Sequence, residues 1–275
     1  AAKKYLDFKA LDLQELLPGA TIFQQGTSQT IGDPLRKLSL LFPTIFSSIG
    51  SISDKIKILQ LNMFLRKKDL NKIFTAPEKT TLQYLQDFGF SDKIIKQFFK
   101  PFFSGIFLEP NLETSSRMFE FVYKMFGDGS AALPKAGMAA IPKQLHAKLQ
   151  NTDFMFNTHV ASVQEGEVTL KDHTTLKSRV TIVATDAREL VASEKHKSTA
   201  WKSCQTLYFE TDHRVIRKEL IGLIPQQGTL INNIFYHTSL KTVSNPSKEL
   251  LSVTVIDRHQ LSDEALISRV KDELQ

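Results

Sequence analysis

The spacing of apolar residues changes along this chain. This change restricts the possible folds more than any other feature of the sequence. Through residues 33–126 apolar side chains recur at intervals of three and four, as they do on one face of a helix. From Asn151 onward they alternate every two residues over short stretches, as they do in half-buried strands. Helices gathered in one part and strands in another, without regular strand–helix alternation, predict an α+β fold.

Residues that start and stop elements locate the expected helices and strands. A hairpin is expected on either side of Gln25-Gly26, Gly89 is expected to end one helix, and Ser91 to cap the next. Residues 101–110 are expected to form an aromatic turn segment. Helices are predicted over 53–66, over 80–88, from 91, from 114 or 115 to 126, and at the C-terminal end; strands are predicted near 20–23, 29–31, 154–156, 161–163, 168–170, 180–184, 205–209, 229–236 and 251–256.

Composition sets wide limits on function. The 275 residues are enough for one large domain or two small ones. A net charge of +6 permits attraction to phosphates or to an anionic membrane, but Lys and Arg are scattered among nearly as many Asp and Glu. Cys204 is the single cysteine, expected as a small buried side chain, and it fits a reducing compartment such as the cytoplasm. Because the chain opens without Met and stops at Gln275 inside a helical pattern, both ends are expected to be cuts.

Several site classes find no support. No run of eighteen apolar residues could span a bilayer, the seven histidines lack metal-site spacing, and no nucleic-acid-binding pattern is present. A serine-nucleophile motif is absent as well. Residues 127–132 match G-x-G-x-x-A, but the preceding residues have helical spacing instead of strand spacing. We therefore interpret this match as a helix-terminating turn and predict neither a metal site nor a nucleic-acid partner.

The densest aromatic stretch, residues 98–107, has two readings. Either its rings pack a helical core, or Phe102, Phe103 and Phe107 line the cavity that binds an apolar small-molecule substrate.

Two groups of cationic residues also have two possible interpretations each. Arg117 pairs with a substrate carboxylate or with a surface acid, and residues 66–68 complement a helix end or bind an anion.

A contact with the membrane surface is a further alternative. The helix predicted over 53–66 carries Ile56, Leu59 and Met63 against basic neighbours, Lys55, Lys57 and Arg66. Ordinary core packing explains the same pattern. The alternative function is therefore that of a non-enzymatic module that binds the surface of a membrane or a protein partner.

One segment points to a family. The loop Leu133-Pro134-Lys135-Ala136-Gly137-Met138 precedes a helix, Asn157-Thr158-His159-Val160 opens a β meander, and Val180-Thr181-Ile182-Val183-Ala184-Thr185 follows. This order resembles the FAD-dependent amine oxidase superfamily, in its phytoene desaturase-like and protoporphyrinogen oxidase-like branch. Ala136 stands where that family usually has its first glycine of Pro-x-Gly-Gly-Met.

The resemblance implies a cofactor, a reaction and a domain organisation. FAD would be held through the backbone of Val160 and near Ala184 and Thr185, and the flavin would remove hydride from an apolar substrate such as a polyene, a porphyrinogen or an amine. Residues 1–132 and 193–275 would form two parts of a substrate domain, and 133–192 a portion of the FAD-binding domain. The family's N-terminal Gly-rich phosphate loop has no counterpart here. The chain alone is therefore expected to be inactive and to retain no FAD.

Overall fold

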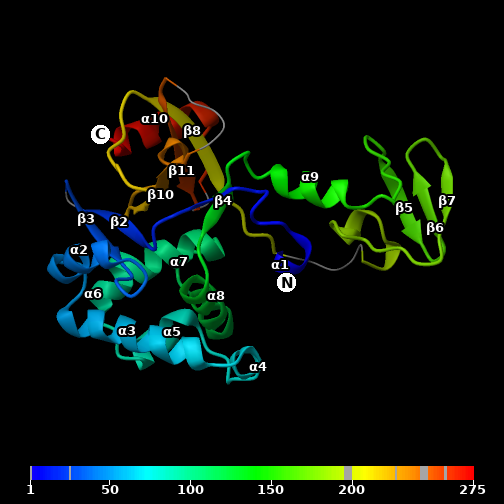
Figure 1. Cartoon of the computed structure of the whole chain (residues 1–275). Coiled ribbons are helices and arrows are strands. Elements are labelled where there is room, and N and C mark those ends of the chain that lie inside the picture. The colour runs from blue at the N-terminus through cyan, green and yellow to red at the C-terminus, as the bar shows by residue number, and fades with distance from the viewer. Residues whose placement is uncertain (1, 25, 195–199, 227, 242–246, 257–258) are drawn as a thin grey trace. The chain divides into compact units, whose positions relative to one another are not determined.

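The computed structural model describes residues 2–24, 26–194, 200–226, 228–241, 247–256 and 259–275. It divides the chain into two compact units (Figure 1). The larger unit contains residues 1–145 and 202–275, and the smaller contains residues 146–201. Mixed helices and antiparallel strands confirm the predicted α+β class.

A helical layer fills the first half of the larger unit, and its helices begin where the sequence supplies caps. Hydroxyl oxygens of Ser51, Thr80, Ser91 and Ser115 accept the backbone N–H groups that each helix start leaves free. Gly89, at φ +88°, follows one helix end, as predicted. The layer contains a 3-10 turn (Leu38–Leu40), α2 (Leu41–Phe46), α3 (Ile52–Lys67), α4 (Leu70–Phe74), α5 (Thr81–Asp87), α6 (Asp92–Ile94), a π-helical turn (Ile95–Phe99), α7 (Lys100–Phe107) and α8 (Ser116–Asp128). Outside it, α1 (Ala2–Tyr5) begins the chain's described part, and α9 (Ala140–Ala147) crosses the boundary between the two units.

A six-stranded sheet forms the second layer of this unit. Its order is β3 (Thr27–Gly32), β2 (Gly19–Gln24), β9 (Ile221–Leu223), β10 (Ile231–Tyr236), β11 (Glu249–Val255) and β8 (Gln205–Thr211). β2 and β9 are parallel, and the other pairs are antiparallel. The helix α10 (Asp263–Glu273) packs on one face, and a separate pair joins β1 (Leu13–Glu15) to β4 (Ala132–Pro134).

Two apolar clusters hold these layers together. The first joins the helices to β2, β3 and β9, with Phe99, Phe103 and Phe119 at its centre. The second lies between α10 and strands β10 and β11, and Val253 and Val270 are fully buried in it. Full burial of such side chains stabilises the fold by about 1.5–3 kcal/mol each.

The smaller unit carries a three-stranded meander, β5 (Val160–Gln164), β6 (Glu167–Leu170) and β7 (Thr175–Lys177). Strands predicted near 161–163 and 168–170 are confirmed, whereas those near 154–156 and 180–184 do not form. Val180 and Ile182 are 80% and 86% exposed. A strand needs a hydrogen-bonded neighbour, and among the described residues none pairs with this segment.

The larger unit corrects two further expectations. Residues 100–107 form α7 and not a turn, because Pro101 lies in the first helical turn, where its missing N–H breaks no helical hydrogen bond. Leu108, at φ +52°, ends that helix. The short strands β1, β4 and β9 were not predicted. The turn reading of residues 127–132 is confirmed, since α8 ends at Asp128 and the Gly129 N–H donates to the Met125 carbonyl.

Candidate functional site

Val160 is the first residue of β5, one of the two edge strands of the meander. It pairs with Leu170 on β6, and the register shifts between Val160 and Ser162. Farther along the same strand, the Val163 N–H donates to the Leu190 carbonyl at 2.8 Å. An edge strand has one side that its own sheet does not pair, and a ligand can hydrogen-bond to backbone groups there.

Ala184 and Thr185 are exposed, and a fixed turn follows them. Asp186 accepts the Arg188 backbone N–H at 3.1 Å and pairs with its guanidinium at 2.5 Å. Hydrogen bonds from the Arg188 side chain and backbone lower the pKa of Asp186 to about 2. Leu190, two residues beyond Arg188, is the residue that contacts Val163. The 184–185 segment and β5 are thus linked within the smaller unit through this turn.

The three predicted phenylalanines lie together on α7 in different environments. Phe103 is 1% exposed and contacts Phe119, with ring centroids 4.7 Å apart. Phe102 and Phe107 are half-buried and pack on the rim of the same cluster. Phe103 therefore serves the core, while Phe102 and Phe107 keep part of their ring surface free for a ligand.

α7 lies directly on β10. The Asn232 Nδ2 donates to the Pro101 carbonyl at 3.1 Å, and the Asn233 Nδ2 donates to the Asn232 Oδ1 at 2.8 Å. A Cβ on Gly105 would lie 2.6 Å from the Asn232 Oδ1, so no side chain fits there without movement. The buried Ser104 hydroxyl has no hydrogen-bond partner among the described residues.

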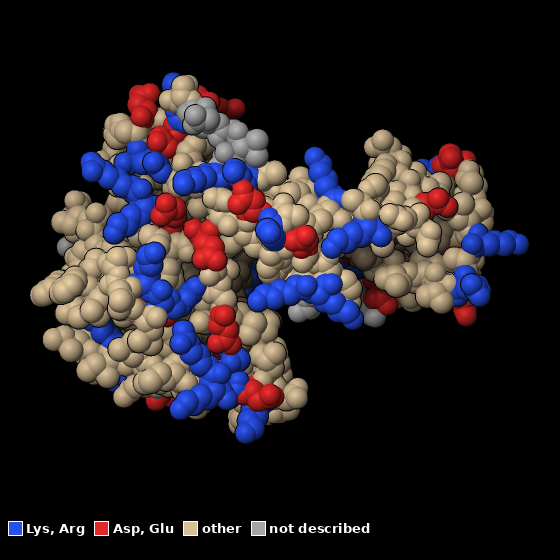
Figure 2. All heavy atoms as spheres, viewed as in Figure 1, with Lys and Arg blue, Asp and Glu red and all other residues tan. Residues whose placement is uncertain are grey.

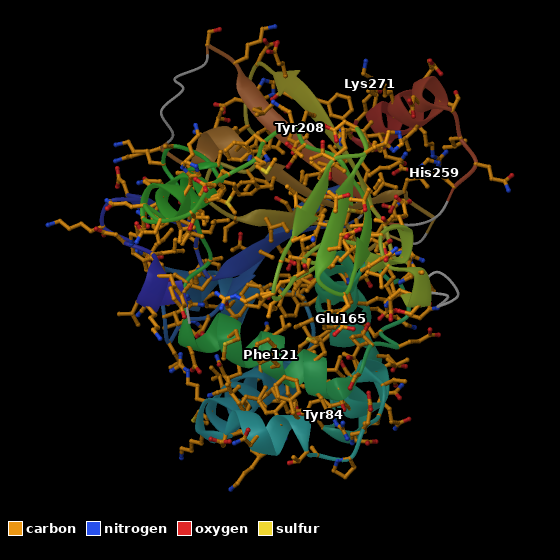
Figure 3. All side chains as sticks on the ribbon, turned by 90° about the vertical axis from the view of Figure 1, so that its right-hand side faces the viewer. Tyr84, Phe121, Glu165, Tyr208, His259 and Lys271 are labelled. Carbon is orange, nitrogen blue, oxygen red and sulfur yellow. The ribbon has the colours of Figure 1, made fainter. Side chains whose placement is uncertain are left out.

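Beyond Asn233, the face of the sheet under α7 becomes open. The register places Phe235 opposite Ser252, and Ser252 opposite Tyr208, so these three side chains share one face. Tyr208, labelled in Figure 3, is 62% exposed. His237 contacts both aromatic neighbours, with ring centroids 5.2 Å from Phe235 and 5.9 Å from Tyr208. We call Tyr208, Phe235 and His237 the open sheet face; Ser252 lies between Phe235 and Tyr208 and is buried.

The open sheet face was not found from the sequence. Alternation within Gln205–Thr211 predicts a strand and identifies two faces, yet it does not say which face α10 covers. Burial of the His237 ring lowers its pKa, so the ring is neutral at neutral pH. Asn232 and Asn233 gave no signal, because an Asn pair in a strand pattern has no distinctive spacing.

The cationic candidates make ordinary structural contacts. Arg117 Nε donates to the Ala76 carbonyl at 2.7 Å, and the guanidinium lies 3.8 Å from Glu78, as the surface-pair reading expects. Arg66 donates to the Gly127 carbonyl, and Lys68 pairs with the buried Glu120 at 2.5 Å. These contacts favour the helix-end reading of residues 66–68 over an anion site.

Three other findings limit the site. Cys204 is exposed, contrary to the expectation that it is buried. Within the described ranges, no cluster of three His, Cys, Asp or Glu side chains could hold a metal ion. Every described helix is too short or too polar to cross a membrane.

Comparisons with known proteins place the chain in a family. A sequence model of flavin containing amine oxidoreductases matches residues 8–275, whereas no curated protein matches. Similar solved structures include a Pyrococcus furiosus protein (TM-score 0.65, 11% identity, 97% of this chain and 67% of that one), an Exiguobacterium sp. 255-15 protein assigned as a protoporphyrinogen oxidase (0.60, 16%, 97% and 67%) and cyclohexylamine oxidase from Brevibacterium oxydans IH-35A (0.61, 12%, 97% and 65%). The chain spans about two thirds of their length, and at such identities they show the fold alone. The family match, covering nearly all residues, means that this chain belongs to the flavin-containing amine oxidoreductases.

Proposed function

We propose that the complete protein is a cytoplasmic FAD-dependent oxidoreductase that removes hydride from an apolar small molecule, such as a polyene, a porphyrinogen or an amine. The observation that carries this proposal is the family match over residues 8–275. Bound FAD would supply the redox chemistry, since its isoalloxazine ring accepts the hydride. The residues of this chain bind the nucleotide and enclose the substrate.

Residues of the smaller unit fit the adenine side of FAD. Val160 opens an edge strand, so its backbone has a side that the meander does not pair. Ala184 and Thr185 are small and exposed, and the Asp186–Arg188 pair holds the turn after them. In this arrangement the backbone atoms of Val160 supply the hydrogen bonds to the adenine base, and its side chain contributes only packing contacts.

Residues of the larger unit fit an apolar substrate. Phe102 and Phe107 offer ring surface on α7, and the open sheet face adds Tyr208 and Phe235. Pockets for small molecules are lined mostly by such side chains with a few polar groups to orient the ligand. The neutral His237 ring supplies one donor and one acceptor without placing a charge beside an apolar molecule.

Anaerobic mixing of the complete protein with one amine, one porphyrinogen and one polyene tests the proposal. Loss of the visible absorbance of oxidised flavin with one of them is the expected result. Tyr208→Ala should raise KM for that substrate with unchanged flavin content, whereas Phe74→Ala, a partly exposed aromatic on α4, should leave KM unchanged. A complete protein without flavin, or flavin that none of the three reduces, would contradict the proposed function.

A further inference from the structure

Two neighbouring helices of the larger unit expose apolar side chains on one surface. Phe46 on α2 is 80% exposed and Ile52 at the start of α3 is 73% exposed. We call this set, together with their exposed neighbours, the docking stripe. Its members are Phe42, Ile45 and Phe46 on α2, and Ile52, Ile56 and Met63 on α3.

The docking stripe is a second apolar face on a helix that already has a buried one. α3 buries Leu61 and Leu65 in the core, whereas Ile52, Ile56 and Met63 recur at four and seven residues along the outward face. A surface helix normally has one apolar stripe, which faces the core. Core packing therefore explains the inner stripe of α3 and leaves the outer one without a partner among the described residues.

α2 and α3 are joined into one surface by Lys55. Its ammonium donates to the Ile45 carbonyl at 2.9 Å and to the Ser47 carbonyl at 2.6 Å, which fixes the end of α2 beside the first turn of α3. Phe42 and Phe46 stack one turn apart on α2, with parallel rings and centroids 6.3 Å apart. The docking stripe is thus held in place and does not depend on a loop.

Positive charges outnumber negative ones around the docking stripe. Residues 34–68 contain seven basic side chains, Arg36, Lys37, Lys55, Lys57, Arg66, Lys67 and Lys68. The acidic side chain among them, Asp54, is 1% exposed and serves as a helix cap, and Asp33 and Asp69 flank this segment. Figure 2 shows a mostly uncharged surface over α2 and the start of α3. On the neighbouring α6, Lys93 adds to the positive charge near Lys55, and Asp92 beside it carries a negative charge.

We propose that the docking stripe binds the surface of an anionic phospholipid membrane. Exposed aromatic and aliphatic side chains enter the boundary between headgroups and acyl chains, and surrounding cations contact the phosphates. Charge favours this occupant over a second copy of this chain, because self-association would bring together two surfaces that each carry more cations than acids. Binding of this kind holds the protein at the lipid surface, from which apolar molecules can be taken up.

Vesicle co-sedimentation of the full chain tests this inference without a flavin. We expect binding to vesicles of phosphatidylglycerol and phosphatidylcholine in equal parts, and weaker binding to phosphatidylcholine alone. Replacing two exposed side chains, Phe46→Ser with Ile52→Ser, should lower the vesicle affinity about tenfold or more. The matched control, Phe156→Ser with Ile182→Ser, removes exposed apolar groups from the smaller unit and should stay within about twofold of the parent.

Three outcomes would overturn the inference. One is a parent chain that stays in the supernatant with phosphatidylglycerol vesicles. Another is a docking-stripe variant, folded by circular dichroism, that sediments as the parent does. The third is a parent that is dimeric without lipid and becomes monomeric in the Phe46→Ser, Ile52→Ser variant, which would make the surface an interface between copies of this chain.

Discussion

Asp54 links two helices, and its replacement tests how this fold is held together. Its Oδ2 accepts the Ser51 N–H, the Ser51 hydroxyl and the Ser91 hydroxyl, each at 2.7 Å, and its Oδ1 accepts the Ser91 N–H at 2.9 Å. Ser51 caps α3 and Ser91 caps α6, so one carboxylate orients the starts of both helices. Burial alone would raise its pKa, but these hydrogen bonds outweigh that effect and lower the pKa from 3.8 to about 2.

The lowered pKa gives the size and the sign of the effect. Because each tenfold change in acid dissociation corresponds to about 1.4 kcal/mol, the ionised form stabilises the fold by about 2–3 kcal/mol. The pKa is lower in the folded than in the unfolded chain, so this stability is fully present above about pH 4–5 and is lost as the pH falls through about 2. Asp54→Asn should therefore lower the free energy of unfolding at pH 7 by about 2–3 kcal/mol. The amide nitrogen of Asn cannot accept a hydrogen bond, so at least one of the Ser51 and Ser91 donors would lose its acceptor.

Urea unfolding followed by far-ultraviolet circular dichroism measures this change. The difference between parent and Asp54→Asn should shrink toward zero as the pH falls from 5 to about 2. Asp87→Asn is the control, because its pair with Lys79 is exposed and screened by solvent, so its loss should hardly change the unfolding midpoint. Fluorescence of Trp201, the single tryptophan, reports on the smaller unit and should not change. Equal unfolding midpoints for parent and Asp54→Asn at pH 7 would refute the reasoning.

Three further predictions concern the candidate site. Phe103→Ala should cost about 3–5 kcal/mol of unfolding free energy because the ring is buried, and half-buried Phe102→Ala should cost clearly less; equal losses in urea unfolding would contradict this. In the complete protein, Val160→Ile should keep the flavin content and Val160→Pro should abolish it, because proline removes a backbone donor; absorbance of the purified variants decides. The His237 ring should titrate below pH 6.5 by NMR, and its burial in the neutral form should make the fold less stable as the pH falls through that range; a midpoint above 6.5 would contradict it.

Hydrogen bonds and backbone preferences that act over a few residues allowed many helix ends to be predicted from the sequence. Ser91 caps a helix through a hydrogen bond to the N–H three residues later, and Gly89 ends one because it adopts positive φ freely. The hairpin around Gly26 and the helix that begins after Ser115 follow from similarly short-range signals. The family resemblance of residues 133–186 also came from a local order of motifs, and the match over 8–275 confirms it.

Contacts between distant residues decided the rest. Residues 180–184 have a strand pattern but no described strand beside them, so the pattern alone could not make a strand. The open sheet face is open because α10 covers the other face of the sheet. Asp54 links two helices because the chain folds back and brings Ser91, 37 residues away, into contact with it. The sequence by itself determined where most elements begin, end and alternate, since hydrogen bonds and periodicity act over a few residues. Only the tertiary structure decided which faces are buried, because burial depends on what packs against them.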